Sequence, residues 1–469
     1  MKATLVSICP TDAARTAGRH ALTPELLAAT GARYSRNNEG LEAIAAKIDP
    51  NRLDASVDSI FRMLDYGHQS IADMVPVAIF MDGISMWLAY HVWSLASVAG
   101  GQESSTRYIR MSPESLLPPE TLGIPEALRG EWRKSMEEAF ARYAALEAAW
   151  TDFGKANPAA MRIPAGLMAD DSDKAKKQVA RMVRNFSFDR ARYLLPSALS
   201  TNVMLVMSAR AWAALCVNLS SQPLPEANAL AEALRAELAL AAPHLLRHAN
   251  ATEDAKAGIA REFAARRAIA ASLAAAPVAD AAPTAHLEAM APAGADGAAM
   301  AAALDFHANR YAWQGPALTR TAVRFSWDAV AFAEMRDLNR HRTGSKYSTF
   351  VPRGFYVAGD QVPGRSLPSA APVAAEAAAA AKFGCGLTGR ARALLAAGDP
   401  SYIYWTLLGT EFDFEHVTTA DKFIYEAELR TGTGAHYRYA QHLRDALGLW
   451  YARYPETKGK VLEGSAEPE

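Results

Sequence analysis

The hydrophobic pattern predicts the same pair of elements twice along the chain. Residues 75–81 are rich in β-prone side chains and predict a strand, which the helical pattern of residues 85–98 follows at once. Residues 323–327 alternate apolar and polar side chains, as in a half-buried strand, and residues 328–342 then show the apolar face of a helix.

Each half of the chain also closes with a helical pattern, at residues 225–245 and at residues 440–456. Strand, helix and polar loop, followed later by a closing helix, therefore occur twice in the same order. Repetition of one supersecondary unit is typical of a duplicated sequence, so we expect an internal duplication.

An alanine-rich segment that also contains Pro and Gly separates the two halves. Roughly half of residues 264–304 are alanine, and alanine interrupted by helix breakers cannot build a core. The sequence therefore predicts a first unit at residues 1–255, an Ala/Pro-rich helix and linker at residues 256–302, and a second unit at residues 303–469.

Composition and charge narrow the class of protein. The 469 residues carry 49 Lys and Arg against 50 Asp and Glu, a formal net charge of −1, so no global positive field attracts nucleic acid or an anionic membrane. Cys9, Cys216 and Cys385 form no CxxC pair, which disfavours a zinc site and a disulfide framework. Without an apolar run of membrane-spanning length or a signal-peptide pattern, we expect a cytoplasmic protein in which any anionic ligand binds to a local cluster.

The first candidate site follows Gly100 and Gly101, which we expect to end the preceding helix. It combines a carboxylate, hydroxyls, a guanidinium and a phenol, groups that bind a phosphorylated sugar. The segment consists of Gln102, Glu103, Ser104, Ser105, Thr106, Arg107 and Tyr108. A solvated loop after a helix has the same composition, so the residues alone leave both interpretations open.

A second candidate site lies at the end of the helix expected at residues 328–342. Arg340, His341 and Arg342 stand there, and Ser345 continues the donor-rich stretch. Cations are favoured at a helix C-terminus by the helix dipole alone, and the same residues are suited to clamp the phosphates of a flavin.

A third candidate site is the region around Arg430. Residues 411–415 alternate Phe with acidic residues, as in an edge strand. Thr418 or Thr419 can cap a following helix, which would carry Arg430 to the turn at Gly432. The guanidinium could then meet a carbonyl or an oxyanion, or form only a surface salt bridge.

These residues resemble the flavin-dependent thymidylate synthases. That family carries a signature of the form RHRxxSxNExSxRY, preceded by a GHxSPFEH-like segment and followed by an ELR-type arginine. The matching segments here are Gly67-His68-Gln69-Ser70, Gln102 to Tyr108, Leu194-Leu195-Pro196, Ser208 to Trp212, Arg340 to Ser345 and Glu428-Leu429-Arg430. The resemblance implies an α+β fold of two tandem units, each a small antiparallel sheet packed with helices.

Each half departs from the signature where the other half keeps it. The first half has Leu95-Ala96-Ser97 in place of RHR and Asn218-Leu219-Ser220-Ser221 in place of the late arginine, whereas the second half lacks the ExSxRY part after Ser345. Because sites in this family are shared between the chains of a homotetramer, the resemblance implies one composite site per pair of halves. It also implies a homodimer with a pseudo-222 arrangement of units.

The resemblance implies a role for each candidate residue. The substrate, an anionic nucleotide-like molecule, would be bound by Gln102, Glu103, Ser105, Arg107, Tyr108 and Arg430. Two of these residues, Ser105 and Arg430, would also take part in catalysis. FAD would be bound by Arg340, His341, Arg342 and Ser345.

The implied activity is reductive methylation of dUMP at C5, with FAD as cofactor and methylenetetrahydrofolate and NADPH as co-substrates. The histidine of the GHxSPFEH-like segment corresponds to Met74 in the first half and to about Thr319 in the second, and neither side chain transfers protons as histidine does. Two alternatives stay open. One is a repurposed FAD-dependent enzyme that modifies another nucleotide or small molecule, and the other is a noncatalytic flavin- or nucleotide-binding protein.

Overall fold

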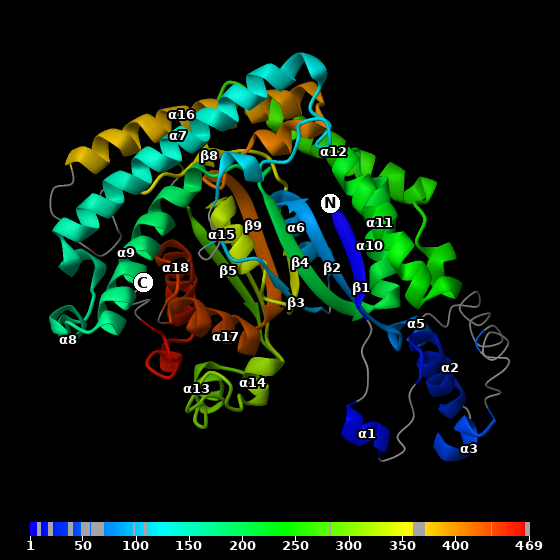
Figure 1. The fold of residues 1–469 in the computed structure, drawn as a ribbon. Coiled ribbons are helices and arrows are strands. Elements are labelled where there is room, and N and C mark those ends of the chain that lie inside the picture. The colour runs from blue at the N-terminus through cyan, green and yellow to red at the C-terminus, as the bar shows by residue number, and fades with distance from the viewer. Residues whose placement is uncertain are drawn as a thin grey trace. The chain divides into compact units, whose positions relative to one another are not determined.

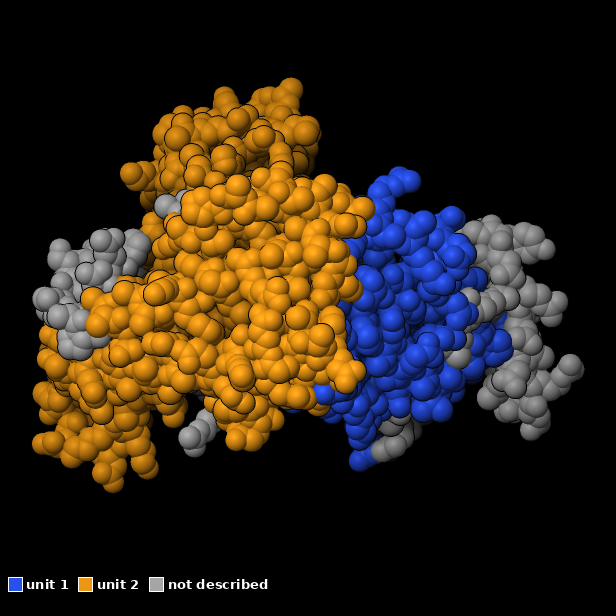
Figure 2. All heavy atoms as spheres, turned by 90° about the horizontal axis from the view of Figure 1, so that it is seen from above, with its two compact units in different colours: residues 1–104, 120–123, 200–263 blue, residues 105–119, 124–199, 264–469 orange. Residues whose placement is uncertain are grey.

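The computed structural model describes residues 1–6, 11–16, 22–35, 41–47, 57, 70–96, 99–106, 111–280, 283–359, 371–432 and 434–464. The chain is an α+β protein with two antiparallel sheets, as the sequence predicted (Figure 1). The residues pack into two compact units, which Figure 2 colours separately. The first unit comprises residues 1–104, 120–123 and 200–263, and the second comprises residues 105–119, 124–199 and 264–469.

The first unit is built on a four-stranded sheet with the strand order β1-β2-β4-β3. Its strands are β1 (Lys2–Val6), β2 (Pro76–Ser85), β3 (Gly100–Glu103) and β4 (Ser200–Ser208). Its helices are α1 (Asp12–Thr16), α2 (Pro24–Tyr34), α3 (Leu41–Ala45), α5 (Ser70–Asp73), α6 (Met86–Leu95), α10 (Ala209–Ser221), α11 (Pro225–Ala241) and the 3-10 helix η5 (Pro243–His248).

The sequence predicted β2 and α6, but it misplaced the end of α6 and the start of the first candidate site. The helix begins where the Ser85 side chain accepts a hydrogen bond from the backbone N–H of Leu88, and it ends at Leu95. Gly100 and Gly101 then begin β3 instead of ending the helix. A Cβ on Gly101 would lie 2.2 Å from the carbonyl oxygen of Met204 on β4, so this glycine permits close pairing of two strands.

The second unit is built on a sheet with the order β5-β6-β9-β7, and β8 also pairs with β9. Its strands are β5 (Ala285–Met290), β6 (Ala322–Ala331), β7 (Ser345–Tyr347), β8 (Gly354–Phe355) and β9 (Thr410–Thr419). The alternation predicted for residues 323–327 is confirmed, because Val323, Phe325 and Trp327 of β6 are buried.

The second unit contains three long helices, α7 (Glu126–Ala156), α9 (Asp173–Ala191) and α16 (Ala371–Ala397), and α7 packs against both α9 and α16. Shorter helices follow strands, and α17 (Ala420–Thr431) and α18 (Tyr437–Arg453) pack on each other and on the sheet. The others are α8 (Ala165–Ala169), α13 (Gly297–Ala302), α14 (Pro316–Thr319), α15 (Phe332–Leu338) and the 3-10 helices η2 (Pro113–Ser115), η3 (Pro158–Met161), η4 (Arg192–Leu194), η6 (Pro400–Trp405) and η7 (Pro455–Thr457).

Two expectations about the second sheet are wrong. The segment at residues 411–415 was expected at a sheet edge, but β9 lies inside the sheet, with β6 on one side and β7 and β8 on the other. The helix expected at residues 328–342 is only α15. Its predicted first turn continues β6 past a register shift between Trp327 and Val330, because Val330 still pairs with Phe412.

The packing divides the chain differently from the expected units 1–255, 256–302 and 303–469. Helix α12 (Glu253–Ser272) extends across residue 255, and residues 124–199 pack within the second unit. Part of the expected linker is the edge strand β5, whose half-buried Ala285, Leu287 and Ala289 alternate with exposed residues. Helix α18 packs against this strand. Within the described ranges, no helix is long and apolar enough to cross a membrane.

Candidate functional site

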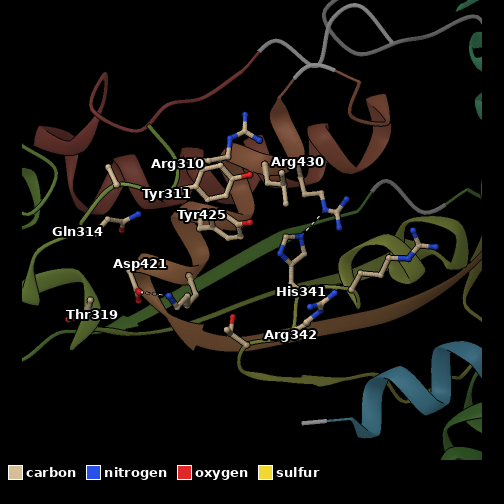
Figure 3. A pocket seen from close by; sticks show the side chains of 14 residues that line it. Arg310, Tyr311, Gln314, Thr319, His341, Arg342, Asp421, Tyr425 and Arg430 are labelled. Carbon is tan, nitrogen blue, oxygen red and sulfur yellow. Dashed lines mark hydrogen bonds and ion pairs between the residues drawn. The ribbon is translucent and has the colours of Figure 1, made fainter. Parts of the chain in front are cut away.

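A pocket of about 660 Å³ lies in the second unit and collects most of the residues predicted there (Figure 3). Arg340, His341 and Arg342, which follow α15, line it together with Arg430 of α17. The sequence placed these residues in two separate candidate sites, some 90 positions apart. Their common pocket makes them one candidate site.

Helix α15 presents the Arg340–Arg342 triplet because the helix itself is fixed in the core. Phe332, Met335 and Leu338 are buried, and so are the charged Glu334 and Arg336. Asn339 closes the helix by donating its backbone N–H to the carbonyl of Met335 at 2.8 Å. The three residues of the triplet therefore leave the helix from a rigid support.

Helix α17 supplies a second wall of the pocket. Asp421, Tyr425 and Leu429 are spaced by four residues, which places them on one face of a helix, and all three line the pocket. Phe423, Ile424 and Ala427 lie elsewhere around the helix and are fully buried. This amphipathic spacing is readable in the sequence, although only Arg430 was singled out there.

Arg430 is held by two hydrogen bonds at the pocket wall. Its Nε donates to Nε2 of His341 at 2.7 Å, and its Nη2 donates to the carbonyl oxygen of Asp337 at 2.8 Å. The guanidinium also lies 5.2 Å from the ring centre of Tyr439. Because Nε2 of His341 accepts a hydrogen bond, this imidazole is neutral, with its proton on Nδ1.

A buried carboxylate and a buried imidazole lie next to His341 of the triplet. Oε2 of Glu426 lies 3.0 Å from Nδ1 of His416, and both side chains are almost fully buried. Nε2 of His416 lies 2.7 Å from the carbonyl oxygen of Thr343, and Lys346 also donates to the Thr343 carbonyl. Burial raises the pKa of Glu426, but the nearby His341, His416 and Lys346 outweigh it and lower this pKa to about 2. Glu426 is therefore an ionised carboxylate, and it lies beside both His341 and His416.

Arginines surround the carboxylate of Asp337 and set the place of Arg340. Nη1 of Arg340 lies 3.7 Å from Asp337, and Nη2 of Arg192 lies 3.3 Å from the same carboxylate. Burial raises the pKa of Asp337, whereas Arg192, Arg340 and Arg430 lower it to about 2. An ionised Asp337 therefore helps to hold Arg340 in place, and it offsets part of the positive charge of that guanidinium.

The sequence missed several pocket residues. Arg310, Tyr311 and Gln314 come from the loop before α14, and Lys422 comes from the first turn of α17. Arg310 and Tyr311 lie several residues after the segment that we expected to be a linker, and no motif marked them. Thr319, the expected counterpart of the missing histidine, also lines this pocket.

The other predicted site residues lie elsewhere or outside the described part. Ser345 begins β7 and pairs with Val417, and it is not among the residues that line the pocket. Gln102 and Glu103 belong to β3 and pair with β4, so they are not in the expected loop. Ser105 and the buried Thr106 follow β3, whereas Arg107, Tyr108 and residues 67–69 lie outside the described residues. The predicted substrate-binding role of residues 102–108 stays a prediction.

The charged residues of the pocket are suited to bind an anion. The residues that line it include five Lys or Arg side chains and one carboxylate, Asp421, which pairs with Lys422 at 3.1 Å. Guanidinium groups bind phosphate with two parallel hydrogen bonds. Among the residues described, no group of three or more His, Cys, Asp or Glu is placed to hold a metal ion.

Comparison with known proteins identifies a family for part of this chain. Residues 19–244 match the model of the Thy1 family, described as thymidylate synthase complementing protein. Over this range the chain is similar to the Thy1 family. The match covers slightly less than half of the 469 residues, and the pocket lies outside it. The resemblance predicted from the sequence motifs is therefore confirmed for the first half of the chain.

No curated protein sequence matches this chain. Among solved structures it is similar to the UMP/dUMP methylase PolB from Streptomyces cacaoi bound with 5-Br dUMP, at 15% identity and a TM-score of 0.32, over 52% of this chain and 93% of that one. It is also similar to PolB bound with 5-Br UMP, at 14% identity and a TM-score of 0.31, over 40% of this chain and 99% of that one.

Proposed function

We propose that this protein is an FAD-dependent, thymidylate synthase-like enzyme whose flavin site is the pocket of the second unit. The family match supports a thymidylate synthase-like protein. One observation carries the proposal further: the two arginine-containing segments expected from the flavin-dependent family, at Arg340–Arg342 and at Arg430, line one pocket.

The residues of the pocket fit a flavin dinucleotide. A volume of about 660 Å³ is in the range of small-molecule sites, and the excess of guanidinium groups suits a pyrophosphate. Arg340 and Arg342 would hold the phosphates. When bound, the flavin would supply a reduced ring that can carry a hydride or a one-carbon unit.

The chain's own residues would orient the reactants and stabilise charge. Arg430 is positioned by His341 and by the Asp337 carbonyl, and in the described part of the chain its Nη1 makes no hydrogen bond. Nη1 can therefore donate to a carbonyl oxygen of the pyrimidine. A guanidinium fixed before the reaction stabilises negative charge that develops on such a ring, and the neutral His341 keeps that guanidinium in place.

We further propose that the chain arose by tandem duplication. The strand orders β1-β2-β4-β3 and β5-β6-β9-β7 are equivalent, and β2 and β6 each contain a register shift near the end. In each series a helix directly follows the second strand, namely α6 and α15. The last strand of each series along the chain, β4 or β9, is likewise followed by two helices, α10 and α11 or α17 and α18. Two unrelated sheets have no reason to share this order of elements.

A local two-fold relation in the second unit supports the same proposal. Pro196 and Leu407 pair in an antiparallel bridge. The backbone N–H of Ser197 donates to the carbonyl of Thr406 at 3.0 Å, and the N–H of Leu408 donates to that of Leu195 at 2.8 Å. Ser197 lies as many residues before the start of α10 as Leu408 lies before the start of α17, and Leu195 and Thr406 correspond in the same way. The two hydrogen bonds are therefore equivalent, with the donor and acceptor segments exchanged. Such reciprocal contacts are typical of two-fold dimers, so they support a fused pair of like units.

The two series differ at the position of Arg430. Leu219 has the same place in α10 that Arg430 has in α17, and it is fully buried. Beside it, Nε2 of His91 lies 3.0 Å from Oδ1 of Asn218. The first unit therefore lacks the guanidinium, which supports a composite site to which the first half contributes Ser105 and Arg107.

One observation favours the alternative of a repurposed FAD-dependent enzyme. Thr319 lines the pocket at about the place where the family resemblance implies a histidine, and a threonine hydroxyl does not exchange protons near neutral pH as an imidazole does. This alternative shares the flavin site with the main proposal, but its substrate would not be dUMP.

Turnover of dUMP to dTMP distinguishes the proposed thymidylate synthase-like enzyme from the alternatives. The purified full chain is incubated with FAD, dUMP, methylenetetrahydrofolate and NADPH, and dTMP is measured. Formation of dTMP supports the thymidylate synthase-like activity. A protein that binds FAD but forms no dTMP is the repurposed or noncatalytic homologue, and a protein that binds no FAD contradicts the proposal.

A further inference from the structure

Two tyrosine rings form an aromatic surface in the pocket, and in Figure 3 they lie between Gln314 and Arg430. The ring centres of Tyr311 and Tyr425 lie 6.1 Å apart, with their planes at 51°. Tyr425 stands on α17 and is half-buried, whereas Tyr311 is 77% exposed. Neither phenol makes a hydrogen bond within the described ranges, so no polar contact explains why two aromatic rings stand here.

The loop that carries Tyr311 is fixed at several points. Nε2 of His307 lies 2.8 Å from Oε1 of Glu428, and both side chains are fully buried. The backbone N–H of Tyr311 itself donates to Oδ1 of Asn309 at 3.0 Å, and the N–H of Gly315 donates to the Ala303 carbonyl at 2.8 Å. Because Glu428 also belongs to α17, the loop is tied to the helix that carries Tyr425. The exposed ring is thus held at the pocket by its backbone.

A cation lies next to this aromatic pair. Arg310 lines the pocket, and Nη2 of its guanidinium is so close to Gly432 that a Cβ there would lie 3.2 Å away. In the described part of the chain Arg310 makes no hydrogen bond and no ion pair. A guanidinium with free donors beside two aromatic faces offers one contact for an anion and another for a planar ring.

We infer that Arg310, Tyr311 and Tyr425 form a subsite for the ring and phosphate of a nucleotide. The ring of the ligand stacks on the tyrosine faces, and Arg310 binds its phosphate. The inference rests on the proposed function, because it adds a nucleotide-recognition role at the same pocket. The ring is either the adenine of FAD or the pyrimidine of the substrate, and the two share this chemistry.

The test compares sugar phosphates with and without a nucleobase. AMP, dUMP and ribose 5-phosphate are titrated into the full chain by calorimetry, and into Tyr311→Leu, Tyr425→Leu and Tyr311→Phe. The matched control is Phe306→Leu, because Phe306 belongs to the same loop and is 74% exposed but does not line the pocket. Base stacking on an aromatic side chain corresponds to about a tenfold change in affinity or more.

We expect the wild type to bind at least one of the two nucleotides about tenfold more tightly than ribose 5-phosphate. Both leucine variants should lose this preference, whereas Tyr311→Phe and Phe306→Leu should keep it. If the affinity for AMP depends on the tyrosines, the subsite binds the adenine of FAD. If the affinity for dUMP depends on them, it binds the pyrimidine of the substrate. Arg310→Gln should weaken the binding of ribose 5-phosphate as well as that of the nucleotides. Equal binding of all three probes, no binding of any probe, or an equal loss in Phe306→Leu would overturn the inference.

FAD binding, measured separately, distinguishes this inference from the proposed function. A tyrosine-dependent preference for nucleotides in a protein that takes up no FAD would leave the subsite standing and refute the flavin enzyme. The subsite would be refuted if both leucine variants took up FAD normally and the protein showed no preference for a nucleobase among the three probes. That result would leave the proposed flavin enzyme standing.

Discussion

Replacing His341 with glutamine should make the protein less sensitive to acid. The imidazole is buried and accepts a hydrogen bond from Nε of Arg430 at 2.7 Å, so a second ring proton would face a donor. Burial lowers the pKa of His341 to about 3, although the carboxylate of Glu426 opposes this shift, and Arg430 adds to it. Glutamine can still accept from Arg430 through its amide oxygen, but it cannot take up a proton.

The size of the effect follows from proton linkage. In the unfolded chain the histidine titrates near its ordinary value of about 6.5, so between pH 6.5 and pH 3 the unfolded chain binds a proton that the folded chain does not. The free energy of unfolding therefore falls as the pH falls, by about 1.4 kcal/mol per pH unit for one proton. Between about pH 6.5 and 4.5 the wild type should lose roughly 2 to 3 kcal/mol more than His341→Gln.

Urea unfolding at several pH values measures this difference. Wild type and His341→Gln are compared at pH of about 7, 6, 5 and 4.5, with His286→Gln on the exposed side of β5 as a control that should follow the wild type. Only the difference between the curves is interpreted, since other groups titrate equally in both proteins. Parallel curves for wild type and His341→Gln would refute the assignment of a buried, neutral His341 that accepts from Arg430.

Three further predictions concern the clamp, its loop and the assembly. Gly344 has φ +78°, and a Cβ there would lie 2.2 Å from the Val417 carbonyl oxygen, so Gly344→Ala should destabilise the protein by more than about 2 kcal/mol. The control Gly386→Ala, where a Cβ would meet open space, should not destabilise it. Equal melting temperatures of the two variants would contradict this prediction. Arg340→Ala with Arg342→Ala should weaken FAD binding by about 3 kcal/mol, roughly a hundredfold, and unchanged flavin content would refute the clamp. Sedimentation should give twice the chain mass of 50.4 kDa, whereas a monomer would contradict the pseudo-222 homodimer.

The elements that the sequence predicted well are those with a strong local pattern. Strands β2 and β6 follow from alternation and runs of β-prone side chains, and α11 and α18 follow from helical periodicity. Strand β9 was predicted as a strand. Phe412 and Phe414 alternate with acidic residues, however, and acidic residues are usually exposed to solvent, so an edge strand was expected. Glu411 is in fact buried, with Nη2 of Arg438 at 3.1 Å from its carboxylate, so the alternation could not reveal a central strand.

The candidate site was found only as far as motifs marked it. Arg340–Arg342 and Arg430 were recognised by a family signature, and the structure brings them together. Tyr311 was missed, because the aromatic residues of this loop, Phe306, Tyr311 and Trp313, have no helical or strand periodicity. Glu426 was missed as well, since a glutamate on a helix is usually solvated and only the tertiary fold places it between two histidines.

Titration of dUMP into the flavin-loaded protein tests the central claim most directly. The wild type, Arg107→Ala and Arg430→Ala are reconstituted with FAD, and the visible absorbance of the flavin is followed as dUMP is added. A composite flavin and nucleotide site predicts stoichiometric FAD and a saturable change in the wild type, with affinity for dUMP weakened by about one to two decades in each variant. The account would be contradicted by a protein that stays colourless after reconstitution, or by equal dUMP affinity in all three proteins.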